Sequence, residues 1–203
     1  RQYCTVFLNI SKEESMTAFT TEKIDVEPWF DMELFMGVSQ ETRLGGDVMD
    51  RFMTLWKNWL PHLTVKGIDT GKIKYLLVAL DESVEQDVDK AWEGSPSNAF
   101  LYNALAQTMC MAAVHAVIPE VQDAGCAPAP KPTATLREAL EAEGIPYSND
   151  KDPILSRRYA VVTHYPFKGG CEICVLQSNC PKGQGQMEAT SVVLPGYEHP
   201  QQM

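Results

Sequence analysis

Basic residues are scarce in this chain of 203 residues, which has 17 Lys and Arg against 27 Asp and Glu and a formal net charge of −10. A protein that binds nucleic acid through the phosphate backbone needs a basic surface, so we expect no general nucleic-acid binding. The sequence also lacks internal repeats. Its short glycine pairs lack the strand, helix and lysine that accompany a phosphate-binding loop. None of these features points to a nucleotide-binding enzyme.

A clear membrane span is missing as well. The longest uncharged stretch, between Glu93 and Glu120, approaches the length of a span, but polar residues such as Asn98 and Gln107 predict a buried helix instead. No secretion signal is recognisable at the start of the sequence. Six cysteines are too sparse for a small secreted disulfide scaffold, and three of them are clustered. We therefore expect a cytoplasmic protein without membrane association; the sequence leaves the oligomeric state open.

Apolar patterns predict both helices and strands. Apolar residues recur every three and four positions across residues 48–60, which predicts an amphipathic helix. Residues 72–80 form a nearly continuous apolar run, which predicts a central strand. Because the elements do not alternate regularly as βαβ units, the predicted fold class is α+β, with a loop-rich C-terminal cluster-binding lobe. Further strands are predicted over residues 3–10, 158–165 and 190–194, and further helices over 83–92, 95–118 and 135–143.

A proline-rich connector is the best candidate for a domain boundary. It runs from Cys126 to Pro132 and contains three prolines, and such segments are stiff and extended. The sequence therefore predicts an α+β N-terminal domain over residues 1–124 and a C-terminal metal- or cluster-binding lobe over residues 133–203. A single domain that includes both is the alternative.

The most specific pattern is a group of three cysteines near the C-terminus. Cys171, Cys174 and Cys180 have C-x2-C-x5-C spacing, preceded by Gly169-Gly170 and followed by Pro181. Two intervening residues let the sulfurs of Cys171 and Cys174 point the same way. The five residues before Cys180 then let its sulfur reach another corner of the same metal centre. Structural zinc usually takes two such pairs, or Cys and His together. Only one pair is present, which favours an iron–sulfur cluster with four ligands.

The spacing resembles the cluster loops of two protein families. Endonuclease III-type DNA glycosylases have C-x6-C-x2-C-x5-C, and here His164 stands at the first position, with six residues between it and Cys171. In RecB-like nucleases of the Cas4 and AddB type, a C-x2-C-x5-C run, often followed by Pro, is completed by a cysteine far upstream; Cys180-Pro181 matches that ending. The resemblance covers His164 to Pro181 and implies a [4Fe-4S] cluster. It implies no DNA chemistry, because neither family's catalytic residues are recognisable.

Four residues are candidates for the fourth ligand. Cys126 lies in an accessible loop beside the predicted boundary and matches the upstream cysteine. His164 has the right local spacing, but a histidine at a strand end is more often a hydrogen-bonded structural residue. Cys110 lies in an apolar helix, where a lone cysteine is usually a small buried hydrophobe. We rank Cys126 first and His164 second, followed by Cys4 and Cys110.

The leading hypothesis is an iron–sulfur protein whose [4Fe-4S] cluster either holds the lobe together or passes single electrons to a redox or protein partner. A Zn²⁺-stapled accessory or interaction module is the alternative, followed by a degenerate cluster-containing nuclease or an oxidoreductase. A redox dithiol at Cys171 and Cys174, and ordinary loop thiols, are further alternatives. Whether the protein is an enzyme stays open.

Charged residues near these motifs are expected to be solvated. Arg157, Arg158, Lys168 and Lys182 bracket the three cysteines, and scattered exposed charges are favoured over a basic patch. The acidic run over residues 81–89 is interpreted as the exposed face of a helix.

Overall fold

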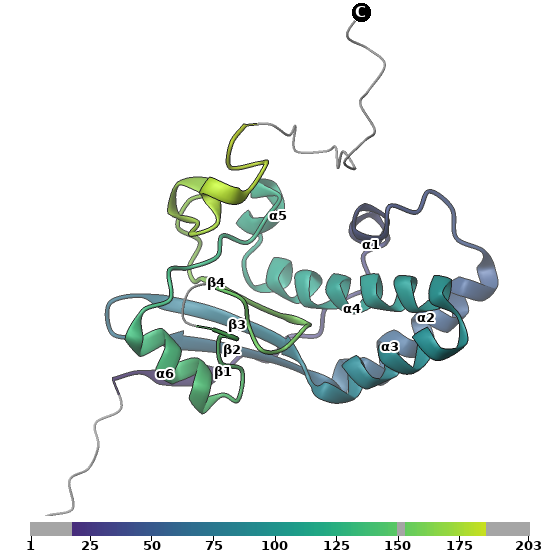
Figure 1. Ribbon diagram of the computed structural model, residues 1–203, viewed down its shortest axis with the longest axis horizontal. Coiled ribbons are helices and arrows are strands. Elements are labelled where there is room, and N and C mark those ends of the chain that lie inside the picture. Colours follow the sequence, from purple (N-terminus) through teal and green to yellow (C-terminus); the bar gives the residue numbers. More distant parts are fainter. Residues whose placement is uncertain (1–17, 150–152, 186–203) are drawn as a thin grey trace, which may run out of the picture.

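The computed structural model describes residues 18–149 and 153–185 of the chain (Figure 1). Within these residues, helices pack around a four-stranded antiparallel sheet of order β1-β2-β3-β4, so the fold is α+β, as predicted. The predicted strands over residues 3–10 and 190–194 lie outside the described residues. In chain order the elements are β1 (Thr20–Lys23), α1 (Met32–Ser39), α2 (Gly46–Trp59), η1 (Leu60–His62), β2 (Leu63–Asp69), β3 (Lys74–Leu80), α3 (Glu82–Gly94), α4 (Pro96–Val117), α5 (Glu120–Ala124), α6 (Ala134–Ala142), β4 (Ala160–His164), η2 (Cys171–Ile173) and η3 (Gln177–Asn179).

Strand β3 is the centre of the fold. It lies between β2 and β4, and its residues from Tyr75 to Leu80 are all buried. Successive side chains of a strand point to opposite faces of the sheet. The even-numbered side chains of β3 therefore enter a core shared with α2, α3 and α4, and the odd-numbered ones enter a core shared with α6. The predicted central strand is confirmed, and its continuous apolar run reflects cover on both faces.

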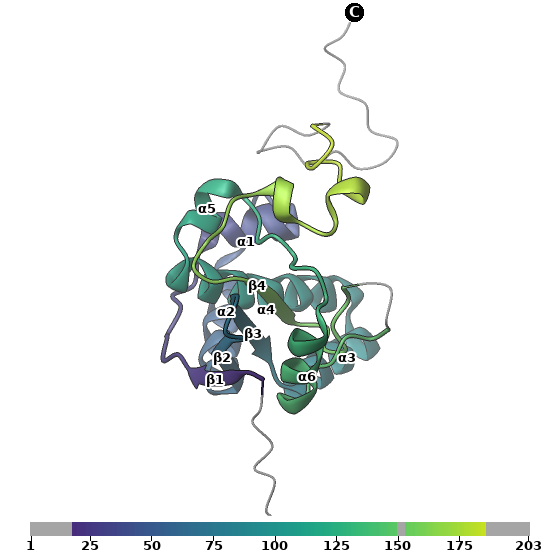
Figure 2. The ribbon, with the colours of Figure 1, turned by 90° about the vertical axis from the view of Figure 1, so that its left-hand side faces the viewer.

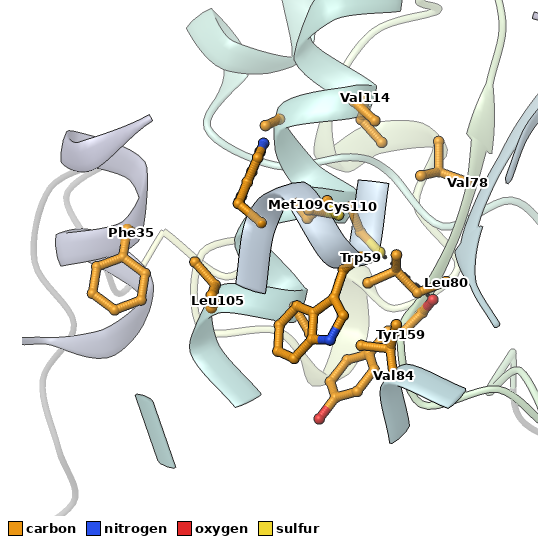
Figure 3. Close-up of a cluster of buried hydrophobic side chains, with 14 of the residues drawn as sticks. Phe35, Trp59, Val78, Leu80, Val84, Leu105, Met109, Cys110, Val114 and Tyr159 are labelled. Carbon is orange, nitrogen blue, oxygen red and sulfur yellow. Dashed lines mark hydrogen bonds between the residues drawn. The ribbon is translucent and has the colours of Figure 1, made fainter. Parts of the chain in front are cut away.

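Helix α4 is the main helix of the larger core. It begins as predicted, with the Ser95 hydroxyl accepting the Asn98 N–H at 3.4 Å and Pro96 as its first residue. The helix packs against α1, α3 and β3, and Figure 3 shows its Met109 beside Trp59 of α2. By length and composition α4 could span a membrane, but half of its apolar window is buried inside the protein. The predicted buried helix is thus confirmed.

Helix α2 presents the apolar stripe that the sequence predicts. Phe52, Trp56 and Trp59 are buried, and the Trp59 indole N–H donates to a carboxylate oxygen of Asp87 on α3 at 3.0 Å. The helix begins after Gly45, which provides no side-chain cap. The position of α2 therefore follows from packing of its aromatic stripe rather than from capping.

The sheet combines segments from both sides of the proline-rich connector. Strand β4 follows the connector and pairs with β3, with Ala160 opposite Ala79 and His164 opposite Tyr75. Helix α6 also follows the connector and covers the sheet face opposite α4 (Figure 1). The connector thus joins parts of one sheet and does not separate two sheets.

Truncation of Leu76 tests the central role of β3. This side chain is fully buried in the larger core, so we expect Leu76→Ala to lower the free energy of unfolding by about 2–5 kcal/mol. Lys72→Ala, in the exposed turn before β3, should change it by less than about 0.5 kcal/mol. Urea unfolding followed by tryptophan fluorescence measures both. Equal midpoints for the two variants would contradict the assigned role of β3.

Candidate metal centre

The three clustered cysteines lie in a loop that follows β4. This segment, residues 168–185, is called the cysteine loop here, and Figure 1 shows it in yellow-green beside α5. Its first turn, η2, is closed by a hydrogen bond from the Cys174 N–H to the Cys171 carbonyl at 3.1 Å. The next is closed by the Gln177 N–H, which donates to the Cys174 carbonyl at 3.1 Å. The loop is therefore a succession of tight turns, with a cysteine at the start of the first.

The cysteine loop has no hydrophobic core of its own. None of the residues from 165 to 185 is buried. Val175 and Leu176, the large apolar residues after Cys174, are 39% and 42% exposed. A segment without buried apolar side chains depends on hydrogen bonds and on crosslinks such as a metal for a fixed shape.

A glycine lets the end of the loop fold back on its middle. A Cβ atom at Gly183 would lie 2.8 Å from the carbonyl oxygen of Gln177 and 3.1 Å from its Cα. No side chain fits at that distance from a backbone, so the close approach of the two segments requires glycine. The Gln184 N–H also donates to the Cys180 carbonyl at 3.1 Å. The chain after Cys180 is thus packed against the turn before it.

The cysteine loop lies beside α5 (Figure 2), and two hydrogen bonds attach it to the end of α5 and to the proline-rich connector. The Val175 N–H donates to the Ala129 carbonyl at 3.0 Å, and the Lys182 ammonium donates to the Ala124 carbonyl. Cys126 lies between these two carbonyls in the sequence. Both bonds bring the segment that carries Cys126 to the loop that carries the other three cysteines, although more than forty residues separate the two segments in the sequence.

The connector is also attached to the sheet. The Thr163 hydroxyl of β4 donates to the Pro128 carbonyl at 3.0 Å, and this bond is buried. Ala127 packs against the larger core, on the α4 side of the sheet. The segment with Cys126 therefore has a fixed position relative to the end of β4.

Cys126 and the three loop cysteines are half-buried free thiols. Burial raises the pKa of the Cys126 thiol, and Lys182 opposes this rise. Cys171, Cys174 and Cys180 each raise the pKa of Cys126 further. The three loop thiols therefore act on Cys126 electrostatically.

The four thiols do not meet at the spacing of a single-ion site. Among the described residues, no three His, Cys, Asp or Glu side chains are arranged to hold a metal ion. One zinc ion with tetrahedral bonds of about 2.3 Å would draw the sulfurs to within about 3.8 Å of one another. A [4Fe-4S] cluster binds each thiolate on a different iron, which keeps the sulfurs further apart. Four cysteines are a ligand set that both groups use.

His164, the second-ranked fourth ligand, faces another part of the protein. Its ring lies 5.5 Å from the ring of Tyr75, on the α6 side of the sheet. Thr163, the neighbouring residue, faces the α4 side and holds the connector. Burial lowers the pKa of His164, as does the charge of Lys168, so the neutral imidazole is favoured. The imidazole Nδ1 is buried without a hydrogen-bond partner among the described residues.

Cys110 belongs to the core, as Figure 3 shows. Its thiol donates to the Tyr159 carbonyl at 3.5 Å, and complete burial raises its pKa to about 12. A protonated thiol in an apolar core is not available as a metal ligand. Cys4, the remaining candidate, lies outside the described residues.

The basic residues around the cysteines do not form one patch. Arg158 pairs with Asp89 of α3 at 2.8 Å, and Arg157 lies 3.9 Å from Glu82 of the same helix. These arginines precede β4, whereas the cysteine loop follows it. The expected scatter of basic charges therefore agrees with the structure. The acidic run of α3 is more than an exposed helix face, since part of it pairs with these arginines.

A Ser, His and Asp group at the end of β3 was not foreseen from the sequence. The His62 Nδ1 lies 2.6 Å from an Asp81 carboxylate oxygen and 3.2 Å from the Ser83 hydroxyl. In a nucleophilic triad the serine and the carboxylate contact different ring nitrogens, whereas here both contact the same one. Asp81 also accepts the Ser83 N–H at 2.9 Å as the cap of α3. The group therefore caps a helix. An Asp followed by a Ser two residues later is its local sequence signal.

Comparison with known proteins finds no relative of this chain: no family model, no curated protein and no solved structure matches it.

Proposed function

We propose that the protein binds a [4Fe-4S] cluster through Cys126, Cys171, Cys174 and Cys180. The observation that carries this proposal is the pair of hydrogen bonds, from Val175 and Lys182, that attaches the backbone on both sides of Cys126 to the loop with the three other half-buried free thiols. Four cysteine thiolates, each bound to its own iron, are the usual ligand set of such a cluster. Three of these thiols belong to the predicted C-x2-C-x5-C group, and Cys126 was the preferred fourth ligand.

The cluster would act first as a structural crosslink. No side chain of the cysteine loop is fully buried, so the free energy of metal–thiolate bonds is the largest source of stability open to it. Transfer of single electrons to a partner protein is the second role. The half-exposed cysteines, and the exposed Val175 and Leu176 beside Cys174, support it, because they put the site near the surface.

Metal analysis of the full chain is the first test. We expect protein purified without oxygen to be brown and to contain about four iron and four sulfide per chain, as a [4Fe-4S] cluster requires. A colourless protein with one zinc per chain would replace the cluster with a zinc staple on the same cysteines. A protein that binds neither iron nor zinc, even after reconstitution with iron and sulfide, would refute the proposed function.

Cysteine substitutions identify the ligands. We expect Cys126→Ser to abolish stable cluster binding, as should the same change at Cys171, Cys174 or Cys180, because a serine hydroxyl is a poor substitute for a thiolate. Iron and sulfide content after reconstitution measures the loss. Cys110→Ala is the matched control, since this thiol lies in the core, and should bind a full cluster.

His164→Gln tests the competing fourth ligand in the same assay. It should bind a full cluster, because His164 faces the α6 side of the sheet. A full cluster in Cys126→Ser together with loss in His164→Gln would reverse this assignment.

Removal of the metal should loosen the cysteine loop and leave the sheet intact. The loop has no core, whereas β3 is buried on both faces. Amide hydrogen exchange of the same protein before and after chelation measures the effect. We expect much faster exchange over residues 168–185 and unchanged exchange over residues 74–80. Equal protection of the loop in both states would exclude a structural role for the metal.

A further inference from the structure

We propose that Lys182 is the positioning residue for the fourth ligand, because its ammonium fastens the Gly125–Cys126 turn to the cysteine loop. The inference rests on the proposed function and adds how the two halves of the site are joined. Lys182 would touch neither iron nor sulfide. It would act through the backbone next to Cys126.

The contact lies at the C-terminal end of α5. The Lys182 ammonium donates to the carbonyl of Ala124, the last residue of that helix. The final carbonyls of a helix have no partner within it and carry partial negative charge, so a cation is favourable there. Lys182 is itself half-buried, whereas Lys131 and Lys168, the other lysines of the connector and the loop, are exposed.

Gly125 makes this close contact feasible. Its φ of +68° is the left-handed conformation that ends α5. A Cβ at this position would lie 2.8 Å from the Lys182 nitrogen. Glycine therefore serves both the backbone turn and the approach of the ammonium. Cys126 follows at once, so the direction of its side chain depends on this turn.

The contact joins the segments that carry two of the proposed ligands. Lys182 stands two residues after Cys180, and Ala124 stands two residues before Cys126. On the other side of Cys126, the Val175 N–H holds the Ala129 carbonyl. The turn with Cys126 is thus attached to the cysteine loop at both of its ends. Without the Lys182 contact, this turn would be attached to the cysteine loop only through the Ala129 carbonyl.

The charge of Lys182 has a second consequence. Four thiolates around a cluster core of charge +2 give the oxidised site a net charge of −2, and reduction adds another negative charge. A nearby ammonium stabilises the more negative reduced form more strongly. Its removal should therefore make the reduction potential more negative, an effect that a purely structural residue without charge would not produce.

Three variants of the full chain test the inference. Lys182→Gln removes the charge and weakens the contact, Lys182→Arg keeps a cationic donor, and Lys168→Gln removes an exposed lysine of the same loop. The first measurement is hydrogen exchange over residues 120–130 in each variant as purified, without chelation. The second is the rate of iron loss to a chelator from reconstituted protein, and the third is the reduction potential of the cluster.

We expect Lys182→Gln to exchange faster over residues 120–130 and to have a more negative reduction potential. It should lose iron about tenfold faster, which is the size of effect found when residues that support metal ligands are substituted. Lys182→Arg should restore all three properties, and Lys168→Gln should match the unsubstituted chain in exchange and iron loss. Unchanged exchange in Lys182→Gln would overturn the inference, whether or not the chain binds metal. Faster exchange in a chain that binds neither iron nor zinc would establish the contact but refute the proposed function and, with it, the role in ligand positioning.

Discussion

The fold depends on the need to cover both faces of β3. Its side chains from Tyr75 to Leu80 are buried, so apolar partners must come from the helices on one face and from α6 on the other. Since α6 and β4 follow the connector, the chain has to cross the sheet on its α4 side before it returns. This path brings the connector, with Cys126, to the end of β4. The cysteine loop begins at the same end of the strand, so the core places the two halves of the candidate site together.

The candidate site is held by different interactions from those that hold the core. No residue of the cysteine loop is buried, and its internal contacts are main-chain hydrogen bonds and the close packing of Gly183 on Gln177. Such bonds in water contribute little net stability each. A centre bound by thiolates would supply the free energy that packing does not. The backbone on both sides of Cys126 is already attached to the cysteine loop, so less chain entropy would oppose such binding.

Elements with a strong apolar period could be predicted from the sequence, and those that depend on partners could not. Residues 72–80 and the stripe of α2 carry their own signals. Strand β1 is exposed along its length, and Gly67 interrupts the apolar pattern of β2, so neither gives a pattern of its own. The loop cysteines were evident from their spacing. Their relation to Cys126 depends on hydrogen bonds between segments that are distant in the sequence. The ion pairs of Arg157 and Arg158 with α3 also join distant segments. Only the fold reveals those contacts.

The attachments of the connector also suggest an order of assembly. The bond from Thr163 to Pro128 is buried in the sheet, so it forms together with the core. The bonds of Val175 and Lys182 join the connector to a loop without a core, so they depend on the shape of that loop. The segment with Cys126 is therefore held by the core, whereas the shape of the cysteine loop is set by main-chain hydrogen bonds. If the proposed centre is bound, the core would fold without the metal, and the metal would order the loop against a cysteine whose backbone is already in place.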